Sequence, residues 1–513
     1  MPKSKNLMQV VRDWLFCLST ATLMLMITST CSPFYAFNDW VDANSFLTMG
    51  KGMIHGLVPY RDLFEQKGPL LYLIHGLAYL IDNTGFFGVF IFETANWTVV
   101  LFFTLKIARL FVRSEYAAFI ALAFTGLTLS STHFETGDSA EEFCFAFILA
   151  MLYLMIRHFK VTYPNPLSDS RALLAGVTAG CVFMIKYTML GYWAGFAFVL
   201  IVACASNRQW KELLRNALFF IIGFLLAIAP WMLYFALNRS LDDFWHTYLY
   251  VNLKFYAKNV TLIDRIRFIG QTLSANLDKN LLAGLVTLFG LGSFSFTRRY
   301  FSNHFGRLAP LVCLFLMAGF SYFGARASGY YFLAFFPFLI FGLIAVGKVI
   351  DDRFQLKLAA GQWQAALLGF CALVVFWAIS FSPNIPLLKN DRQDYPQYRF
   401  AAIINQVPEA TLLNYGFLDG GFYTAANLTP TLKYFMVNNI SDSKFPVMRD
   451  EQDRYLQEKL TGFVVIRMGK DADATTYEAP FLHENYELVD EMNFKYKANS
   501  TLEFKYALYQ VRN

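Results

Sequence analysis

The sequence predicts a mainly α-helical, polytopic membrane protein with about eleven transmembrane helices and a small C-terminal α/β domain. Of the 513 residues, 56% are hydrophobic and only 16% are charged, whereas soluble domains carry about 25% charged residues. Apolar runs long enough to cross a bilayer recur throughout residues 1–382. The composition then changes abruptly, and residues 383–513 alternate short helical and strand-like patterns.

Each transmembrane helix is predicted from an apolar run of about 17 residues or more. These runs lie near residues 14–34, 88–108, 115–133, 140–157, 214–237, 281–297, 306–323, 330–347 and 363–382. A further block over 172–205 is too long for one crossing and is interrupted at Lys186, so it is predicted as two helices. The first run follows Lys3, Lys5 and Arg12 and lacks a small-x-small cleavage site, so we expect a retained helix rather than a signal peptide.

The apolar run 69–81 is the exception. Its roughly 13 residues would rise only about 20 Å as a helix, short of a hydrocarbon core of about 30 Å, so we interpret it as an interfacial or re-entrant helix. With the N-terminus in the cytoplasm, every inner loop is then basic, as the positive-inside rule requires. The bases are Lys106, Arg109 and Arg113; Arg157, His158, Lys160 and Arg171; Arg208, Lys211 and Arg215; Arg298, Arg299 and Arg307; and Lys348, Arg353 and Lys357.

This topology assigns the other polar segments to the outer face. They are the loop 35–87 with its interfacial helices, the stretches 132–142 and 238–279, the turn 326–331, and the tail. In the tail we expect helices over 397–407 and 451–460 and strands over 411–415, 462–467 and 502–511. The chain therefore divides into a transmembrane domain, residues 1–382, and an extracytoplasmic α/β domain, residues 383–513.

Several functional classes are disfavoured by composition and motifs. The net charge of +6 is explained by the inner bases, so no nucleic-acid partner is expected. Seven cysteines occur without a CxxC spacing, which argues against a disulfide framework or a zinc site. The sequence has no P-loop, GxGxxG unit, HExxH or GxSxG, which disfavours a nucleotide-driven pump and a soluble-type hydrolase.

The outer loop holds the first candidate residues. Asp42 begins a helix-like stretch with Phe46 and Met49 on one apolar face, so it either caps that helix or acts as a general base at the membrane surface. Arg61 and Lys67 lie in the turn-rich segment 59–69. They either bind a phosphate or anchor the loop at the interface, because both uses select the same residue types.

The second group of candidates lies in or beside the predicted spans. Glu93 is inside the span 88–108, where an ionisable group is costly and marks a functional site or a helix-helix partner. Asp138, Glu141 and Glu142 lead into the span 140–157, where acids also favour the helix dipole. Lys186 and Arg326 are outer-face bases near helix ends, and they run against the positive-inside bias.

Ordered motifs carry a family resemblance. Asp42-Ala-x-x-Phe46, Gly56-Leu-Val-Pro59 and Phe64-Glu-Gln-Lys-Gly-Pro-Leu70 resemble the first outer loop of GT-C membrane glycosyltransferases, the clan of protein O-mannosyltransferases and the lipid A aminoarabinose transferase. Segments 88–94, 137–143 and 183–188 resemble a bacterial branch of that clan, and Gly329–Pro337 resembles its late histidine-tyrosine motif. The likeness covers residues 14–382 in order, and the tail resembles an appended extracytoplasmic domain.

The resemblance implies transfer of a sugar from a polyprenyl-phosphate-linked donor to an envelope acceptor (wall polysaccharide, teichoic acid or glycolipid) on the outer face of a bacterial plasma membrane. Asp42 would be the general base of a single, inverting displacement. The substrate-binding set would be Arg61, Glu65, Lys67, Glu93, Asp138, Glu141, Glu142, Lys186, Arg326, Tyr330 and Tyr331. Of these, Lys67, Lys186 and Arg326 would hold the lipid phosphate, and Glu93 with Glu141 or Glu142 would line the sugar or acceptor cavity.

The sequence also departs from the family pattern. Ala43 replaces the second acid of an Asp-Glu pair, Gly68 replaces a proline, and Tyr330 or Tyr331 stands where histidine is usual. The first change argues against a two-carboxylate or metal-assisted scheme, so no cofactor is expected, while a divalent metal requirement stays open. Membrane lipids are the remaining expected partner.

Two other classes stay open. A transporter or flippase of a polar lipid would also carry acids within the membrane, although the sequence shows no repeated halves and its acids cluster at one face. A non-enzymatic envelope scaffold fits the composition but leaves Asp42 and Glu93 unexplained.

Overall fold

The structure, a computed structural model, describes residues 2–496 and 502–512. The chain divides into two compact units. The first unit comprises Met1–Thr28, Glu93–Trp231 and Asn259–Ser382, and the second comprises Ser29–Phe92, Met232–Lys258 and Pro383–Asn513. The outer loop 35–87, which the sequence assigned to the transmembrane domain, therefore packs in one unit with the C-terminal segment, residues 383–513.

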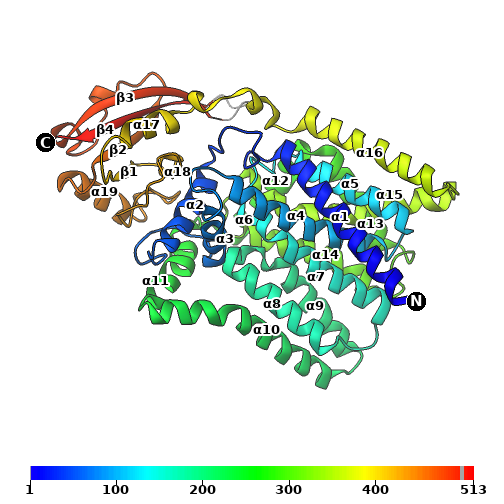
Figure 1. Cartoon of the computed structure of the whole chain (residues 1–513). Helices are drawn as coiled ribbons and strands as arrows, with labels where there is room; N and C mark the ends of the chain where they lie inside the picture. The colour runs from blue at the N-terminus through cyan, green and yellow to red at the C-terminus, as the bar shows by residue number, and fades with distance from the viewer. Residues whose placement is uncertain (1, 497–501, 513) are drawn as a thin grey trace. The chain divides into compact units, whose positions relative to one another are not determined.

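Each predicted transmembrane run contains an α-helix (Figure 1). The helices are α1 (Pro2–Thr28), α4 (Phe87–Ala108), α5 (Ser114–Leu129), α7 (Phe145–Arg157), α8 (Asp169–Lys186), α9 (Gly191–Ser206), α10 (Trp210–Leu237), α13 (Leu281–Phe296), α14 (His304–Tyr322), α15 (Leu339–Phe354) and α16 (Ala360–Phe381). Among the described residues, eight helical runs are long and apolar enough to cross a membrane, or nine if a bent pair counts as one span. The chain is thus a multi-pass membrane protein.

Two local causes reduce the predicted eleven spans to nine. Helix α5 has only 16 residues, and α8 and α9 form one helical run of 38 residues, Asp169–Ser206. That run reverses direction at the 3₁₀ turn Tyr187–Leu190. The reversal is evident from Trp193 Nε1, which donates to the carbonyl of Ala175 at 3.0 Å. In a straight helix 18 residues would separate the two by about 27 Å. The predicted division at Lys186 is therefore correct, and Figure 1 shows α8 beside α9.

The bent pair is α12 (Leu262–Lys279) and α13, which meet at 118°. Helix α12 presents most of its length to the surface, whereas α13 is apolar throughout. The polar stretch predicted over 238–279 is therefore helical, and the span predicted from 281 begins at the bend.

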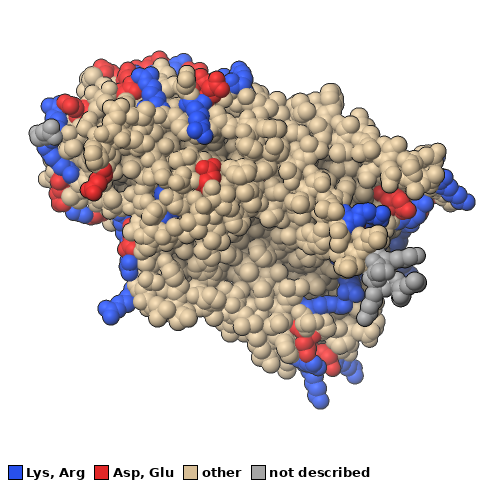
Figure 2. All heavy atoms as spheres, in the orientation of Figure 1, with Lys and Arg blue, Asp and Glu red and all other residues tan. Residues whose placement is uncertain are grey.

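The basic connections of the first unit meet at one end. Arg109 pairs with Asp13, Arg113 with Asp351 at 2.8 Å, and Arg299 with Asp352. Lys160 Nζ donates to the carbonyl of Tyr300 at 2.8 Å, and Arg215 pairs with Asp169. These contacts join the connections that the sequence assigned to the inner side. In Figure 2 the helices of this unit show a largely uncharged surface between their ends.

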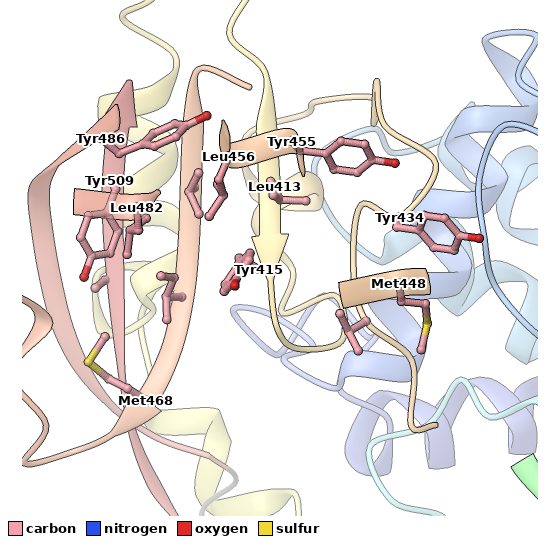
Figure 3. Packing of buried hydrophobic residues seen from close by; sticks show 14 of the residues in the cluster. Leu413, Tyr415, Tyr434, Met448, Tyr455, Leu456, Met468, Leu482, Tyr486 and Tyr509 are labelled. Carbon is pink, nitrogen blue, oxygen red and sulfur yellow. The ribbon is translucent and has the colours of Figure 1, made fainter. Parts of the chain in front are cut away.

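The second unit is built on a four-stranded sheet of order β1-β2-β4-β3. Strands β1 (Leu412–Tyr415) and β2 (Phe463–Gly469) are parallel, and β4 (Glu503–Val511) is antiparallel to both β2 and β3 (Tyr486–Lys495). Helices α17 (Pro396–Ile404) and α19 (Val447–Gln457) match the two predicted helices. Leu413, Tyr415, Met448, Leu456 and Tyr509 lie in its buried core (Figure 3).

Helices α2 (Val41–Ile54) and α3 (Pro69–Tyr79) of the same unit cross backbone to backbone. A Cβ on Gly50 would lie 2.3 Å from the amide nitrogen of Gly76, so only glycine permits this approach. Helix α3 has 11 residues and is about 16 Å long, which agrees with the short helix predicted over 69–81. Residues from α11 (Leu241–Phe244) and the π-helix Trp245–Tyr256 complete the unit.

Candidate active site

A tight turn in the first unit arranges three of the predicted acids. Glu135, Gly137 and Asp138 have φ values of 58°, 87° and 65°, a left-handed backbone that glycine and aspartate tolerate best. The turn ends at Ser139, whose Oγ accepts the amide N–H of Glu142 at 3.0 Å and caps the short helix α6 (Ala140–Phe143). Asp138, Glu141 and Glu142 are thereby held, all buried, within five consecutive residues.

Glu93 and Glu142 are brought together by this turn. The backbone N–H of Asp138 donates to Glu93 Oε1 and to Glu142 Oε2, both at 2.9 Å. Trp97 Nε1 donates to the other oxygen of Glu142 at 2.6 Å, and Asn96 Nδ2 donates to its carbonyl at 2.9 Å. Both carboxylates are fully buried. These hydrogen bonds join α4 to α6 and supply the donors that a buried carboxylate requires.

Glu141 points into a different set of side chains. It forms a buried ion pair with Lys186, at the end of α8. Lys186 Nζ also lies 4.2 Å from the ring centroid of Tyr331 and 5.4 Å from that of Tyr330, within the range of cation–π attraction. The structure therefore brings four of the predicted site residues into one cluster.

Two buried oxygen atoms in this cluster lack protein partners. Glu141 Oε2 and the hydroxyl of Tyr322 make no hydrogen bond to any residue in the described ranges 2–496 and 502–512. The ring centroid of Tyr322 lies 6.5 Å from that of Tyr331. Because buried polar atoms are almost always paired, a water molecule or a polar group of a ligand would complete their hydrogen bonds.

The segment that carries Tyr330 and Tyr331 is tethered by His133. His133 Nδ1 is 2.7 Å from the carbonyl oxygen of Gly329 and its ring centroid is 4.8 Å from that of Phe332. Gly329 begins the 3₁₀ helix Gly329–Phe338. Arg326 lies half-buried three residues earlier, in the same connection, and its predicted phosphate contact stays a prediction.

The second unit holds the other predicted residues. Asp42 is in the first turn of α2 and is 9% exposed. Phe46 follows one turn later on the same side of the helix, and Lys67 Nζ lies 5.3 Å from its ring centroid. Asp42 and the ring that Lys67 approaches therefore lie on the same side of α2.

Glu65 positions Lys67. Its Oε2 accepts the backbone N–H of Lys67 at 2.7 Å and the hydroxyl of Tyr72, while its Oε1 is 3.6 Å from Lys67 Nζ. The hydroxyl of Tyr60 donates to the carbonyl of Lys67 at 2.6 Å. Burial raises the pKa of both tyrosines well above its usual range, so both stay hydroxyl donors. Glu65 thus holds the loop around Lys67 in place through these contacts.

Arg61 forms hydrogen bonds within the protein. It makes two 2.8 Å hydrogen bonds to Asp62, and its Nη1 donates to the carbonyl of Asn238 at 2.9 Å. The hydrogen bond from Arg61 lowers the pKa of Asp62. The side chain of Arg61 is 41% exposed, so its charge is partly available, and its predicted contact with substrate stays a prediction.

Some residues of these clusters had no signal in the sequence. Tyr322 is the last residue of an apolar span, and Trp97, His133 and Tyr72 are aromatic side chains among many others. Two of these roles depend on partners far away in the chain: Trp97 bonds to Glu142, 45 residues later, and His133 to Gly329, 196 residues later. In the described part of the chain, no three His, Cys, Asp or Glu side chains are arranged as ligands for a metal ion.

Comparison with known proteins gives a family and a fold. The family model described as "Putative competence-induced protein Ccs4 N-terminal domain" matches residues 3–362. No curated protein matches the sequence. The crystal structure of ArnT from Cupriavidus metallidurans bound to undecaprenyl phosphate is similar at a TM-score of 0.59 and 13% identity, over 97% of this chain and 98% of ArnT.

The apo structure of the same ArnT is similar at a TM-score of 0.59 and 14% identity, over 91% of this chain and 94% of that one. The likeness therefore extends through the helices and the C-terminal sheet. It confirms the predicted GT-C fold.

Proposed function

The chain belongs to the family described as "Putative competence-induced protein Ccs4 N-terminal domain", and from this premise and its GT-C fold we propose that it is a membrane glycosyltransferase. It transfers a sugar from a polyprenyl-phosphate carrier to an envelope acceptor, namely a wall polysaccharide, a teichoic acid or a glycolipid. The observation that carries the proposal is the cluster of Lys186, Glu141, Tyr322 and Tyr331. In it, Glu141 Oε2 and the Tyr322 hydroxyl are buried and make no hydrogen bond to the residues that the structure describes.

The lipid donor is proposed from charge and from the fold. The similar ArnT structure contains undecaprenyl phosphate, and Lys186, Lys67 and Arg326 are the bases that would meet such a phosphate here. A phosphate that approaches Lys186 would share or replace the ion pair with Glu141, since charge-assisted hydrogen bonds to phosphate are strong. These bases also stabilise the phosphate as the leaving group, which is the electrostatic part of catalysis.

The chemical step is a single displacement at the anomeric carbon. Asp42 accepts the proton of the acceptor hydroxyl while that oxygen forms its bond to carbon. The bond between carbon and the phosphate oxygen breaks, and the lipid phosphate leaves with the electron pair. One displacement inverts the anomeric configuration. Glu141 Oε2 and the Tyr322 hydroxyl would bind sugar hydroxyls, and the rings of Tyr330 and Tyr331 would pack against the sugar.

Sidedness is part of the proposal. The basic connections meet at one end of the first unit, which the positive-inside rule assigns to the cytoplasm. The N-terminus is then cytoplasmic, and the C-terminal segment lies outside the plasma membrane of a bacterium. Catalysis would take place on that outer face, where the lipid-linked donor is presented.

The test uses the full-length protein in detergent. It is incubated with a panel of hexoses and pentoses linked to undecaprenyl phosphate and with extracted envelope glycans and lipids, and release of undecaprenyl phosphate is measured. Asp42→Asn should lower turnover by about 10²- to 10⁴-fold. The matched control is Asp39→Asn, which replaces a buried acid three residues away. Full turnover in Asp42→Asn would refute the base. Movement of the donor across proteoliposomes without bond cleavage would identify a flippase instead.

A further inference from the structure

Helix α2 is held by the C-terminal segment through a buried carboxylate. Thr48 Oγ1 donates to Asp419 Oδ2 at 2.6 Å. The other oxygen of Asp419 accepts the N–H of Gly421 at 2.9 Å and Nδ2 of Asn414 at 3.1 Å. Asp419 is fully buried, and these donors offset part of its desolvation.

A buried lysine makes the second attachment. Lys51 Nζ donates to the carbonyls of Tyr423 at 3.0 Å and Leu428 at 3.2 Å, and the residue is 1% exposed. Near the start of the helix, Thr424 Oγ1 donates to Asn44 Oδ1 at 2.9 Å. All three contacts join α2 to residues 419–428, which lie more than 370 positions later in the sequence.

Glycine allows the close approach at this junction. Gly421 has φ of 92°, and a Cβ there would lie 2.9 Å from Asn44 Oδ1 and 2.7 Å from Phe37. Both the backbone conformation and the space therefore require glycine. The 419–428 segment thus packs its main chain directly against α2.

These attachments lie on the side of α2 opposite Asp42. At about 100° per residue, Asn44, Thr48 and Lys51 fall on one stripe of the helix. Asp42 and Phe46 lie on the opposite side, which Lys67 approaches. Directional polar contacts on the back of the helix fix its rotation and register more tightly than apolar packing would, because each hydrogen bond requires one geometry.

We propose that the C-terminal segment is a positioning element for Asp42. Asp419 and the carbonyls of Tyr423 and Leu428, acting through Thr48 and Lys51, set the rotation of α2 so that its Asp42 side faces Lys67. The inference rests on the proposed function, because it concerns the base assigned there. It gives the C-terminal segment a role in the transfer step in addition to that of an appended domain.

The key variant is Thr48→Val, which removes one hydrogen bond and keeps the shape of the side chain. Asp419 then retains Gly421 and Asn414, so the protein should fold. In the full-length protein, amides of residues 41–54 should exchange hydrogen faster, and kcat should fall about 10- to 100-fold, as expected for a misplaced catalytic group. KM for the donor and the affinity for undecaprenyl phosphate alone should stay within about twofold. Lys51→Met should act in the same direction.

Two controls separate positioning from general stability. Thr48→Ser keeps the hydroxyl and should restore kcat. Asp490→Asn breaks the ion pair with Arg399 inside the same C-terminal segment and should leave kcat and exchange in α2 unchanged. Loss of kcat in Asp490→Asn equal to that in Thr48→Val would overturn the inference.

The outcomes for the two proposals differ. Wild-type kcat in Thr48→Val and Lys51→Met, together with an inactive Asp42→Asn, would refute positioning and leave the proposed function intact. If the wild-type protein releases no undecaprenyl phosphate from any donor, the proposed function fails and the catalytic part of this inference falls with it. Unchanged exchange in α2 would refute the attachment itself, whatever the activity.

Discussion

Lys186 and Glu141 form a largely buried ion pair that lies against the ring of Tyr331. The two residues come from different helices, 45 positions apart. Removing one partner of such a pair leaves an uncompensated buried charge, which typically costs about 3–5 kcal/mol. The pair therefore links the stability of the first unit to the proposed phosphate contact, and the two effects can be separated by mutation.

Lys186→Met should destabilise the protein by about 3–5 kcal/mol and weaken binding of undecaprenyl phosphate by tenfold or more, roughly the value of one charge-assisted hydrogen bond. The double variant Lys186→Met with Glu141→Gln removes both charges and should regain most of the stability but none of the binding. Thermal unfolding and a lipid-binding titration measure the two quantities. Recovery of binding in the double variant would exclude a direct phosphate contact by Lys186.

Tyr322→Phe should affect activity without affecting folding. The hydroxyl has no hydrogen-bond partner among the residues the structure describes, so its removal should leave the unfolding temperature unchanged or slightly higher. If a sugar hydroxyl binds there, kcat/KM for the donor should fall about tenfold or more. Tyr192→Phe is a suitable contrast, because the hydroxyl of Tyr192 donates to the carbonyl of Ala334 at 2.8 Å. That variant should lose stability.

The sequence predicted those parts of the structure that leave a continuous local signal. Apolar runs located the spans, Lys186 marked the reversal between α8 and α9, and the basic loops were correctly grouped on one side. Strand β3 was missed because acids at Glu487, Asp490 and Glu491 interrupt its apolar residues. Its sheet position follows from pairing with β4, which no single segment encodes.

The organisation of the second unit could not be predicted from local sequence patterns, for the same reason. Thr48 and Asp419 are 371 residues apart, and each is an ordinary polar residue in its own segment. Only the fold shows that the outer loop and the tail share one packed unit. Residue type and spacing could nominate the candidate acids and bases, and their roles stay predictions. That Glu141 and Glu142 contact different side chains is a matter of side-chain geometry, which the sequence does not show.

The buried Lys51 predicts a pH dependence of stability. Burial lowers its pKa from the ordinary value of 10.5 to about 7, so between these values the unfolded chain binds a proton that the folded chain does not. Stability should therefore rise as pH increases from about 7 toward 10.5, by at most about 1.4 kcal/mol per pH unit. Well below pH 7 the folded and the unfolded chain both bind this proton, so Lys51 adds no pH dependence to the stability there.

The measurement compares thermal unfolding of the wild type and Lys51→Met at pH 7.5 and 9.5. Burial also raises the pKa of the neighbouring Asp419. The difference between the two proteins therefore reports Lys51 together with its effect on Asp419. The wild type should gain stability relative to the variant at the higher pH. An equal response of both proteins would contradict the shifted titration of Lys51.

The crossing of α2 and α3 predicts a sharp difference between two glycines on one helix. A Cβ on Gly50 would meet backbone atoms, namely the nitrogen of Gly76 at 2.3 Å and the carbonyl oxygen of Tyr72 at 2.7 Å. Backbone cannot yield without separating the helices, so Gly50→Ala should cost about 1–3 kcal/mol or more. It should also displace Tyr72 from Glu65 and thereby lower activity.

Gly52→Ala is the matched control for this prediction. Its Cβ would lie 2.5 Å from Leu63 Cδ1, a flexible group that can rotate away, and at ordinary contact distances of 3.6 Å or more from Leu57. Alanine also favours the helix over glycine by up to about 1 kcal/mol, so Gly52→Ala should be close to neutral. Thermal unfolding of the two variants makes the comparison, and similar losses in both would mean that α2 and α3 are not in backbone contact.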